Sequence, residues 1–451
     1  MNSSEFRRLV RLANRITYGA NRRLLQTVEA LGYEGFVESQ LDDEAIDDSE
    51  LEALLQSILP TLSMSRQALY DHVFEDENFG APQRDLLIAT LIRRTFSPRQ
   101  LFERMVEFWS DHFSVPANDL PVALFKFTED RDLMRTQAMG NFETLLQRDA
   151  RSPAMLYYLN NFNNTVEGPN ENYARELLEL HTLGVDGGYT EGDIKEIARV
   201  FTGWSIRLPG EFEFRYFSHD WQPKQVFGQQ IEPTGLDEGE FVLSTLASHP
   251  STARHVVTRL ARRFSADIPD PQLIDDVADA FVSTSGDIKA TLRSLLLHPL
   301  VAEAATIKFK RPNEFMAGLT RALESELSEQ SLVASFEMLD SAGHLPFAWP
   351  APDGYPDRRE YWQSSNGLLA RFNAAAAWTE QLAPQSGVLQ QAAAIDNPIE
   401  QIDFLAEALR PEGMAPATRR RMLRYANRLG EQERPAALAA WLLSGPEAQW
   451  R

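Results

Sequence analysis

Residues 97–115 read SPRQLFERMVEFWSDHFSV, and the spacing of their apolar side chains predicts a helix. On a helical wheel of about 100° per residue, one face collects an apolar set: Leu101, Phe102, Met105, Val106, Phe108, Trp109 and Phe113. Ser97 and Pro98 supply a start signal, and Gln100 is placed to close a capping box. His112 falls within the apolar face, so we expect its side chain to point into the core.

The same spacing of three and four residues recurs along most of the chain, as in NRRLLQTVEALGYEGFVESQL, RDLLIATLIRRTF, ARHVVTRLARRF and IKATLRSLLLH. One exception is 211–232, EFEFRYFSHDWQPKQVFGQQIE, where Phe212, Phe214 and Tyr216 alternate with polar residues. A Trp-Gln-Pro turn separates this run from a second short one, which predicts a β-hairpin. The sequence therefore predicts an all-α fold, a multi-helix globular bundle with one small β-hairpin insertion.

Two segments rich in proline and glycine interrupt the helical pattern. Residues 343–356, GHLPFAWPAPDGYP, hold too many prolines for a helix interior and predict an ordered loop over the surface. Residues 383–398, APQSGVLQQAAAIDNP, are typical of a linker. We therefore expect a main helical domain over 1–382 and a C-terminal helical unit, 398–451, packed on it.

Composition narrows the class of function and the types of ligand. The 451 residues include 44 Lys and Arg against 65 Asp and Glu, a formal charge of -21. This charge disfavours nucleic acid and anionic membrane surfaces, which are bound by clustered cations. The chain has no cysteine, so a metal site would need His, Asp and Glu ligands.

No targeting or membrane segment is visible in the sequence. The start, MNSSEFRRLVRLANRITYG, lacks the apolar run of a secretory signal or a transmembrane anchor. The default expectation is a cytoplasmic protein, unless an export signal has been removed. The signatures of phosphate loops, dinucleotide sites, zincins and α/β-hydrolases (GxxxxGK[ST], GxGxxG after a strand, HExxH, GxSxG) do not occur.

A second helix with an inward histidine is predicted at 170–184, NENYARELLELHTLG. His181 falls inside its apolar arc, whereas Glu171, Arg175 and Glu179 follow at i, i+4 steps on the other side. That spacing favours an exposed, salt-bridged face, in which each pair contributes a few tenths of a kcal/mol. Glu176 lies at the boundary between the two faces.

Two inward histidines on two helices permit two interpretations. A single buried histidine is most often a core residue that is hydrogen-bonded to a carbonyl or a carboxylate. Helical bundles, however, also build metal and acid-base sites from inward polar side chains on facing helices. At the expected hairpin turn, His219, Asp220 and Lys224 offer a further ligand pair or acid-base pair.

The order of several segments resembles a known bacterial family. The segments are FWSDHFSV, GNFETLLQ, SPAMLYYLNN, PNENYARELLELHTLGVDGGYTEGDIKEIARVFTGW, HDWQPKQVFG, KRPNEFMAGLTRAL and GHLPFAWPAPDGYPDRREYW. Together they are similar to the family catalogued as domain of unknown function 1800, from about Ala13 to the SGPEAQ near the C-terminus. The resemblance brings no established activity. It implies a periplasmic or extracellular location if an export signal was removed, and a sulfatase-like protein as a partner.

The leading hypothesis is an enzyme with four catalytic side chains: His112, Glu176, His181 and Asp220. Its substrate would be bound by another four: Arg175, Lys224, Trp349 and Tyr355. In a metal-dependent version, His112, His181 and His219 hold one divalent ion that activates water. In a metal-free version, a histidine and Glu176 act as acid and base. The envelope association of the family suggests hydrolysis or transfer on an envelope polymer such as a carbohydrate.

The alternative is a non-catalytic helical scaffold that binds a partner. Its contact surface would be the aromatic loop that carries Phe347, Trp349, Tyr355 and Trp362, because exposed aromatic side chains anchor interfaces. The net acidity favours a partner with a basic patch, and the sulfatase-like protein is the candidate.

Overall fold

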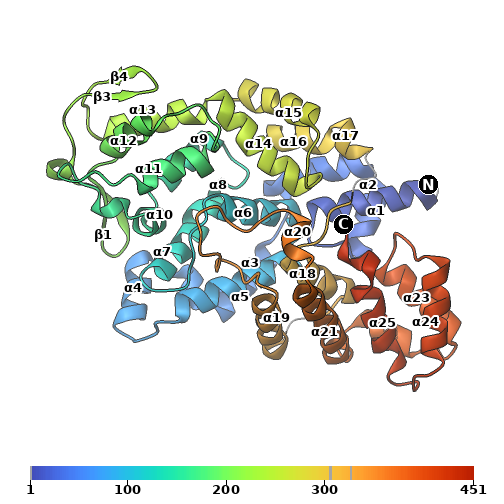
Figure 1. The fold of residues 1–451 in the computed structure, drawn as a ribbon. Helices are drawn as coiled ribbons and strands as arrows, with labels where there is room; N and C mark the ends of the chain where they lie inside the picture. The colour runs from blue at the N-terminus through green and yellow to red at the C-terminus, as the bar shows by residue number, and fades with distance from the viewer. Residues whose placement is uncertain (1–2, 304–306, 326–327) are drawn as a thin grey trace.

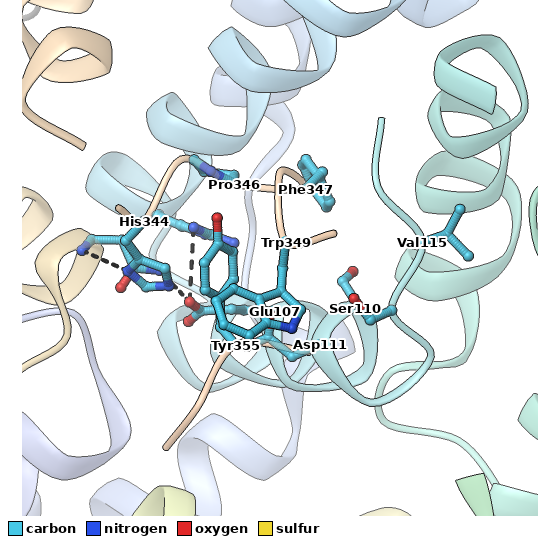
Figure 2. A pocket seen from close by; sticks show the side chains of 12 residues that line it. Glu107, Ser110, Asp111, Val115, His344, Pro346, Phe347, Trp349 and Tyr355 are labelled. Carbon is cyan, nitrogen blue, oxygen red and sulfur yellow. Dashed lines mark hydrogen bonds and ion pairs between the residues drawn. The ribbon is translucent and has the colours of Figure 1, made fainter. Parts of the chain in front are cut away.

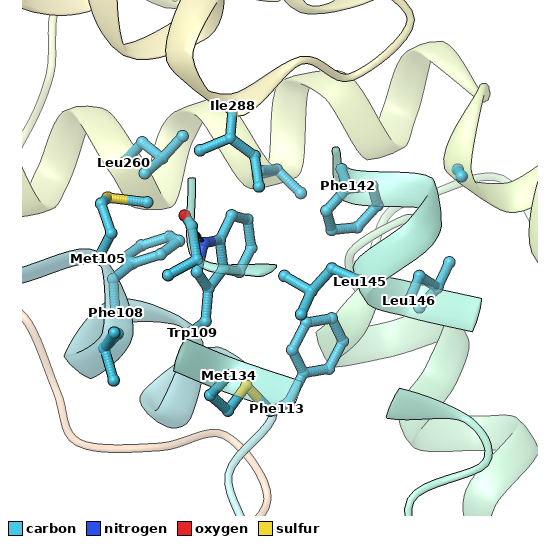
Figure 3. Packing of buried hydrophobic residues seen from close by; sticks show 14 of the residues in the cluster. Met105, Phe108, Trp109, Phe113, Met134, Phe142, Leu145, Leu146, Leu260 and Ile288 are labelled. Atoms are coloured by element: carbon cyan, nitrogen blue, oxygen red, sulfur yellow. Dashed lines mark hydrogen bonds between the residues drawn. The ribbon is translucent and has the colours of Figure 1, made fainter. Parts of the chain in front are cut away.

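The helix predicted from residues 97–115 lies at the centre of the molecule (Figure 1). In the computed structural model, which describes residues 3–303, 307–325 and 328–451, it is α6 (Gln100–His112). Its apolar face packs in the main core, where Met105, Phe108 and Trp109 lie near Phe142 and Leu145 (Figure 3). The described residues form helices throughout, with two small two-stranded sheets, which confirms the all-α prediction.

In the described residues, the first half of the chain supplies α6 and eleven further helices. Their bounds are α1 (Ser3–Ile16), α2 (Arg22–Leu41), α3 (Ser49–Ile58), α4 (Arg66–Phe74), α5 (Ala81–Phe96), α7 (Val122–Glu129), α8 (Arg135–Gln137), α9 (Phe142–Asp149), α10 (Pro153–Tyr158), α11 (Asn172–Glu176) and α12 (Glu191–Val200). Short π-helical turns, Asp130–Met134 and Leu177–His181, follow α7 and α11.

The second half adds two groups of helices. The first group completes the main core with α13 (Leu236–Ala247), α14 (Pro250–Phe264), α15 (Pro271–Ser283), α16 (Ile288–Leu297) and α17 (Pro299–Ala302). The second group consists of α18 (Pro312–Leu323), α19 (Glu329–Ser341), α20 (Arg359–Trp362), α21 (Ser365–Leu382), α22 (Gly387–Ala393), α23 (Pro398–Leu409), α24 (Pro416–Ala426) and α25 (Arg434–Ser444).

A separate apolar cluster joins helices from both sides of the expected domain boundary at residue 398. Phe315 and Leu319 of α18 and Trp378 of α21 share it with Leu405 of α23 and Leu438 of α25. The division into two domains remains a prediction. Across the described ranges, no helix combines the length and the apolar character needed to cross a membrane.

The start of α6 differs from the predicted cap. The helix begins at Gln100, and Ser97 instead ends α5 as its C-cap. The Ser97 hydroxyl donates to Asp48 at 2.7 Å, and the Gln100 amide nitrogen donates to the carbonyl of Ser97 at 2.8 Å. The amide oxygen of Gln100 accepts from the N–H of Tyr18 at 2.9 Å and not from the N–H of Ser97, as a capping box requires. The capping residues therefore close a tight connection between two helices.

The predicted β-structure is present, but as two hairpins instead of one. β1 (Trp204–Arg207) pairs antiparallel with β2 (Glu211–Phe214), and β3 (Lys224–Val226) pairs with β4 (Gln229–Ile231). The expected partner of the Phe212–Phe214 run was the later segment, but a 3-10 turn and Pro223 separate them. Proline donates no ladder hydrogen bond, so β2 pairs with the strand before it.

The proline-rich segment 343–356 lies across the C-terminal end of α6. The carbonyl of Phe347 accepts from the N–H of Ala117 at 2.7 Å, and the Tyr355 hydroxyl donates to the carbonyl of Leu345 at 2.7 Å. Gly354 has φ +72°, and a Cβ there would lie 1.9 Å from the carbonyl oxygen of Asp111. Only glycine therefore permits this approach to α6.

Candidate functional site

Buried ion pairs surround the C-terminal end of α6, and we call them the central ion network. The network consists of Glu107, Asp111, Arg263, Arg311 and Asp357. Oδ2 of Asp111 accepts from Nη2 of Arg263 and from Nη1 of Arg311, each at 2.8 Å. Arg311 also contacts Glu107, and Arg263 also contacts Asp357. The network therefore ties α6 to α14 and to the residues that precede α18 and α20.

Glu107 is the most heavily bonded carboxylate of the network. The Tyr18 hydroxyl donates to its Oε2 at 2.7 Å, and the Asn313 amide donates to its Oε1. Burial alone would raise the pKa of Glu107, but Arg311 and Arg94 outweigh burial and hold this pKa well below its usual value. Glu107 is therefore a fixed anion, and its role is to hold cations in place.

A covered cleft lies between α6 and the proline-rich segment. Figure 2 shows the rings of Trp349 and Tyr355 over the part of α6 that carries Glu107 and Asp111. His344 lines the other side of this cleft. Its free volume is about 10 Å³, room for about one water molecule. A substrate would enter this cleft only after the segment 343–356 had moved.

A larger pocket opens on the other side of Asp111 and Tyr355, and we call it the arginine pocket. Its volume is about 280 Å³, and its charged lining consists of Asp111, Asp353, Asp357, Arg259, Arg262, Arg263 and Arg358. Helix α14 supplies three of the four arginines, and Arg358 caps α20. The tight approach of Gly354 to the carbonyl of Asp111 holds the segment before α20 against α6 at one side of this pocket.

Three arginines of this pocket have no acidic partner among the residues that the structure describes. Arg259 donates only to the carbonyls of Asp353 at 3.1 Å and Asp111 at 3.4 Å. Arg262 donates to the carbonyl of Asp267 at 3.3 Å. Arg358 is exposed and makes no ion pair in the described ranges. Arg321 and Arg371 also lack an ion pair in the described residues, but only the arginine pocket brings several such arginines to one cavity lining.

Burial is the main cause of lowered pKa values at two of these arginines. Burial lowers the pKa of Arg259 to about 10, while the charges of Asp111 and Asp357 raise this pKa and those of Arg263 and Arg262 lower it. Burial and the nearby Arg358 lower the pKa of Arg262, and the charges of Asp357 and Asp267 raise it. An anion bound between the two side chains would offset the cost of their desolvation.

The two inward histidines do come together, and a third histidine joins them. The rings of His112 and His181 are 6.2 Å apart, and the ring of His255 is 6.1 Å from that of His112. Burial lowers the pKa of all three, to about 3 for His181 and about 4 for His255. They are therefore neutral at physiological pH.

The hydrogen bonds of these histidines set their tautomers. Nε2 of His112 donates to the carbonyl of His181 at 2.9 Å, and Nε2 of His255 donates to the carbonyl of Leu180 at 2.8 Å. A carbonyl only accepts, so Nε2 carries the proton and Nδ1 keeps its lone pair in both rings. His255 also lines the arginine pocket. No carboxylate contacts His112 or His181 in the described part of the chain.

His219, Asp220 and Lys224 form a group of their own near the second hairpin. Nε2 of His219 lies 3.0 Å from Oε1 of Glu238, and Lys224 contacts the other oxygen of that carboxylate. Asp220 accepts from Nε of Arg199 at 2.7 Å. The polar side-chain atoms of these three residues thus bond to neighbours around the second hairpin. In the described ranges, no contact links the three residues to His112 or His181.

The remaining predicted site residues lie in three places. Arg175 is on the surface with Glu171, Glu179 and Glu191 at 2.9–3.6 Å, the salt-bridged face expected from the sequence. Glu176 is half-buried, and burial followed by the charge of Glu179 raises its pKa. Trp349 and Tyr355, which were predicted to bind the substrate, line the covered cleft, and Tyr355 also lines the arginine pocket.

The described residues contain no preformed metal-binding site. No cluster of three or more His, Asp or Glu side chains is arranged around a common point there. The expected ligands divide between two places, because His219 bonds to Glu238 while His112 and His181 lie together.

A second buried charge cluster lies beside the proline-rich segment. Lys126 contacts Glu129, and the Ser152 hydroxyl donates to that carboxylate at 2.8 Å. Neither carboxylate oxygen of the nearby Asp149 has a hydrogen-bond partner in the structure as described. Burial and the adjacent Glu129 raise the pKa of Asp149 well above its usual value, so Asp149 is a buried carboxylic acid.

The residues of the arginine pocket escaped the sequence analysis. The segment HVVTRLARR places His255, Arg259 and Arg262 at steps of four and three, so they share one face of α14. Such charged stripes are usually solvated surface, and the apolar face is the stronger pattern in this segment. The sequence feature that could have indicated the pocket is the lack of acidic residues on the turns of α14 next to these arginines.

The comparisons with known proteins agree with the order of segments noted in the sequence. No curated protein and no solved structure matches the chain at a significant level. A family model described as protein of unknown function (DUF1800) matches residues 11–450. The chain therefore belongs to the DUF1800 family of proteins of unknown function.

Proposed function

We propose that the protein binds an anionic ligand in the arginine pocket. The observation that carries the proposal is the group of three guanidinium ions, Arg259, Arg262 and Arg358, that lack an acidic partner in the described residues. Arg259 and Arg262 are half-buried and Arg358 is exposed. A half-buried cation without a counter-ion carries a desolvation cost that a bound anion would offset. Guanidinium groups also match carboxylate and phosphate oxygens in a bidentate manner.

The size of the pocket favours a small ligand or the end of a larger one. Its volume of about 280 Å³ is at the lower limit of the range for drug-sized ligands, about 300–1,000 Å³. A polymeric substrate, such as an acidic envelope carbohydrate, would therefore present a terminal group to the pocket.

An enzyme that hydrolyses or transfers this ligand is the second candidate. The feature that favours it is His255, which lines the pocket as a neutral imidazole with an unprotonated Nδ1. Acid-base catalysis needs such a group near the ligand. Gly184 lies against Nδ1 and Nε2 is bonded to Leu180, so His255 would act on a ligand only after the backbone at Gly184 had moved away from Nδ1.

Partner docking through the aromatic loop has less support. Tyr355 and Trp362 are only 7% and 3% exposed and pack with Phe309 in a small apolar cluster of their own. Aromatic side chains that are already buried offer little area to a partner. A sulfatase-like partner would therefore have to contact another surface.

Substitution of Arg259 tests the proposal directly. In Arg259→Gln we expect the affinity for sulfate to fall about 10- to 100-fold, since one charged hydrogen-bond donor contributes about 1.5–3 kcal/mol. Isothermal titration calorimetry at low ionic strength measures this change. Arg254→Gln is the matched control, because Arg254 is exposed on the same helix and pairs with Asp275. Equal affinity in all three proteins would contradict the proposal, as would no binding by the wild type.

A further inference from the structure

The balance of charge in the arginine pocket identifies the type of anion that it suits. Asp111 and Asp357 already pair with Arg263, with Arg311 and Lys308 as their additional cations. Glu107, Asp267 and Arg94 belong to the same set of ion pairs. Among the described residues, its four acids and four cations balance and leave no charge for a ligand. The charges that remain at the pocket surface are those of Arg259, Arg262, Arg358 and Asp353.

The remaining groups carry two uncompensated positive charges. Three arginines face one acid, and Asp353 is itself engaged, because its Oδ1 accepts from the indole N–H of Trp349 at 2.7 Å. A ligand with one negative charge would leave one of these positive charges uncompensated. A ligand with two negative charges would neutralise the pocket.

The shape of the donor groups points in the same direction. Two guanidinium groups project from successive turns of α14, at positions 259 and 262, and the third projects from the start of α20. Planar forks that approach from more than one wall suit a tetrahedral oxyanion, whose oxygens point in several directions. A planar carboxylate presents only two oxygens in one plane and would engage fewer of these donors.

We infer that the ligand carries a terminal phosphate, free or as a monoester, and that the arginine pocket binds it as the dianion. The inference rests on the proposed function, which requires only that some anion binds there. A phosphodiester and a sulfate ester each carry one negative charge, and a carboxylate carries one charge on a planar group. These groups should therefore bind more weakly than a phosphomonoester.

The charges of the groups that line the arginine pocket do not change between pH 5.0 and pH 7.5, the range over which a phosphomonoester becomes a dianion. His255 is neutral above its pKa of about 4, and burial raises the pKa of Tyr355 well above its usual value. Arg259 stays protonated because its pKa of about 10 lies well above pH 7.5. Burial would lower the pKa of Arg263, but Asp357 and Glu107 raise it above its usual value. Burial would raise the pKa of Asp357, but Arg263 and Lys308 hold it well below its usual value. Two further carboxylates, Asp111 and Asp353, complete the charged lining.

Calorimetric titration of the full chain with glycerol 2-phosphate, at pH 5.0 and pH 7.5, tests the inference. A phosphomonoester has a second pKa of about 6, so only about a tenth of it is dianionic at pH 5.0. We expect the apparent affinity to be about tenfold lower at pH 5.0 than at pH 7.5. Inorganic sulfate remains a dianion throughout, and its affinity should stay constant, which controls for changes in the protein.

Three monoanions complete the test at pH 7.5. Acetate, dimethyl phosphate and methyl sulfate should each bind at least tenfold more weakly than glycerol 2-phosphate. If a monoanion binds as tightly as the phosphomonoester, the inferred dianion requirement is wrong while the proposed anion site stands. If no anion binds, the proposed function itself fails. The Arg259→Gln and Arg254→Gln proteins assign any binding to the pocket, because only the first should lose it.

Discussion

Replacement of Glu107 by glutamine is expected to destabilise the protein by about 3–5 kcal/mol. The Glu107 carboxylate contacts Arg311, accepts from Tyr18 at 2.7 Å and lies 3.3 Å from Arg263. Glutamine has nearly the same shape as glutamate but no charge. The buried arginines would still be desolvated, but they would lose the attraction of the carboxylate that offsets this cost. Loss of one partner from a buried ion pair is costly for this reason.

Urea denaturation followed by circular dichroism measures this effect. The matched control is Glu29→Gln, because Glu29 is exposed on α2 and surface substitutions usually change stability by less than about 0.5 kcal/mol. A Glu107→Gln protein as stable as the control would show that the central ion network contributes little to the fold.

Replacement of Lys126 by methionine is expected to cost a similar amount, about 3–5 kcal/mol. Lys126 and Glu129 are both fully buried and contact each other, and Lys126 also lies 5.7 Å from the ring of Phe347. Methionine fills nearly the same volume but leaves the Glu129 carboxylate without its cation. The free energy of unfolding from urea titration at pH 7 measures the loss.

The neighbouring acid supplies a contrasting variant, Asp149→Asn. The pKa of Asp149 is raised by burial and by Glu129, whereas the unfolded chain ionises near a pKa of about 3.9. The stability that depends on protonated Asp149 is fully present below that pH and is lost as the pH rises toward the folded pKa. The Asp149→Asn protein cannot ionise there, so we expect its stability relative to wild type to increase from pH 4 to pH 8. If the relative stability is flat or falls, Asp149 is ionised in the folded protein.

The fold was largely predictable because apolar spacing is a local property. The helix at 97–115 and its inward His112 follow from the positions of Leu101, Met105 and Trp109 alone. The capping box at Ser97 was wrong because the side-chain oxygen of Gln100 accepts from Tyr18, a residue far away in the sequence, although the Ser97 hydroxyl does accept from the N–H of Arg99 at 3.1 Å. The predicted pairing of Phe212 and Phe214 with the later run was wrong, because β2 pairs with β1, a run that lies before 211–232.

The candidate site was less predictable because its partners are distant in sequence. His112 and His181 were expected to meet, and they do, but His255 comes from a third helix whose apolar face drew attention first. Glu107 pairs with Arg311, more than two hundred positions away. Whether the charge of an arginine is neutralised depends on which acidic side chains the fold brings next to it. The sequence of α14 alone does not show this.

The most direct test of the account is a crystal structure with tungstate, a tetrahedral dianion that can be located by its anomalous scattering. We predict an anomalous peak in the arginine pocket, within hydrogen-bond distance of the guanidinium groups of Arg259 and Arg262 and next to Arg358. The same crystals of Arg259→Gln should show a weaker peak or none. A wild-type structure in which the pocket holds no anion, while tungstate binds at other surface arginines, would contradict the proposed anion site.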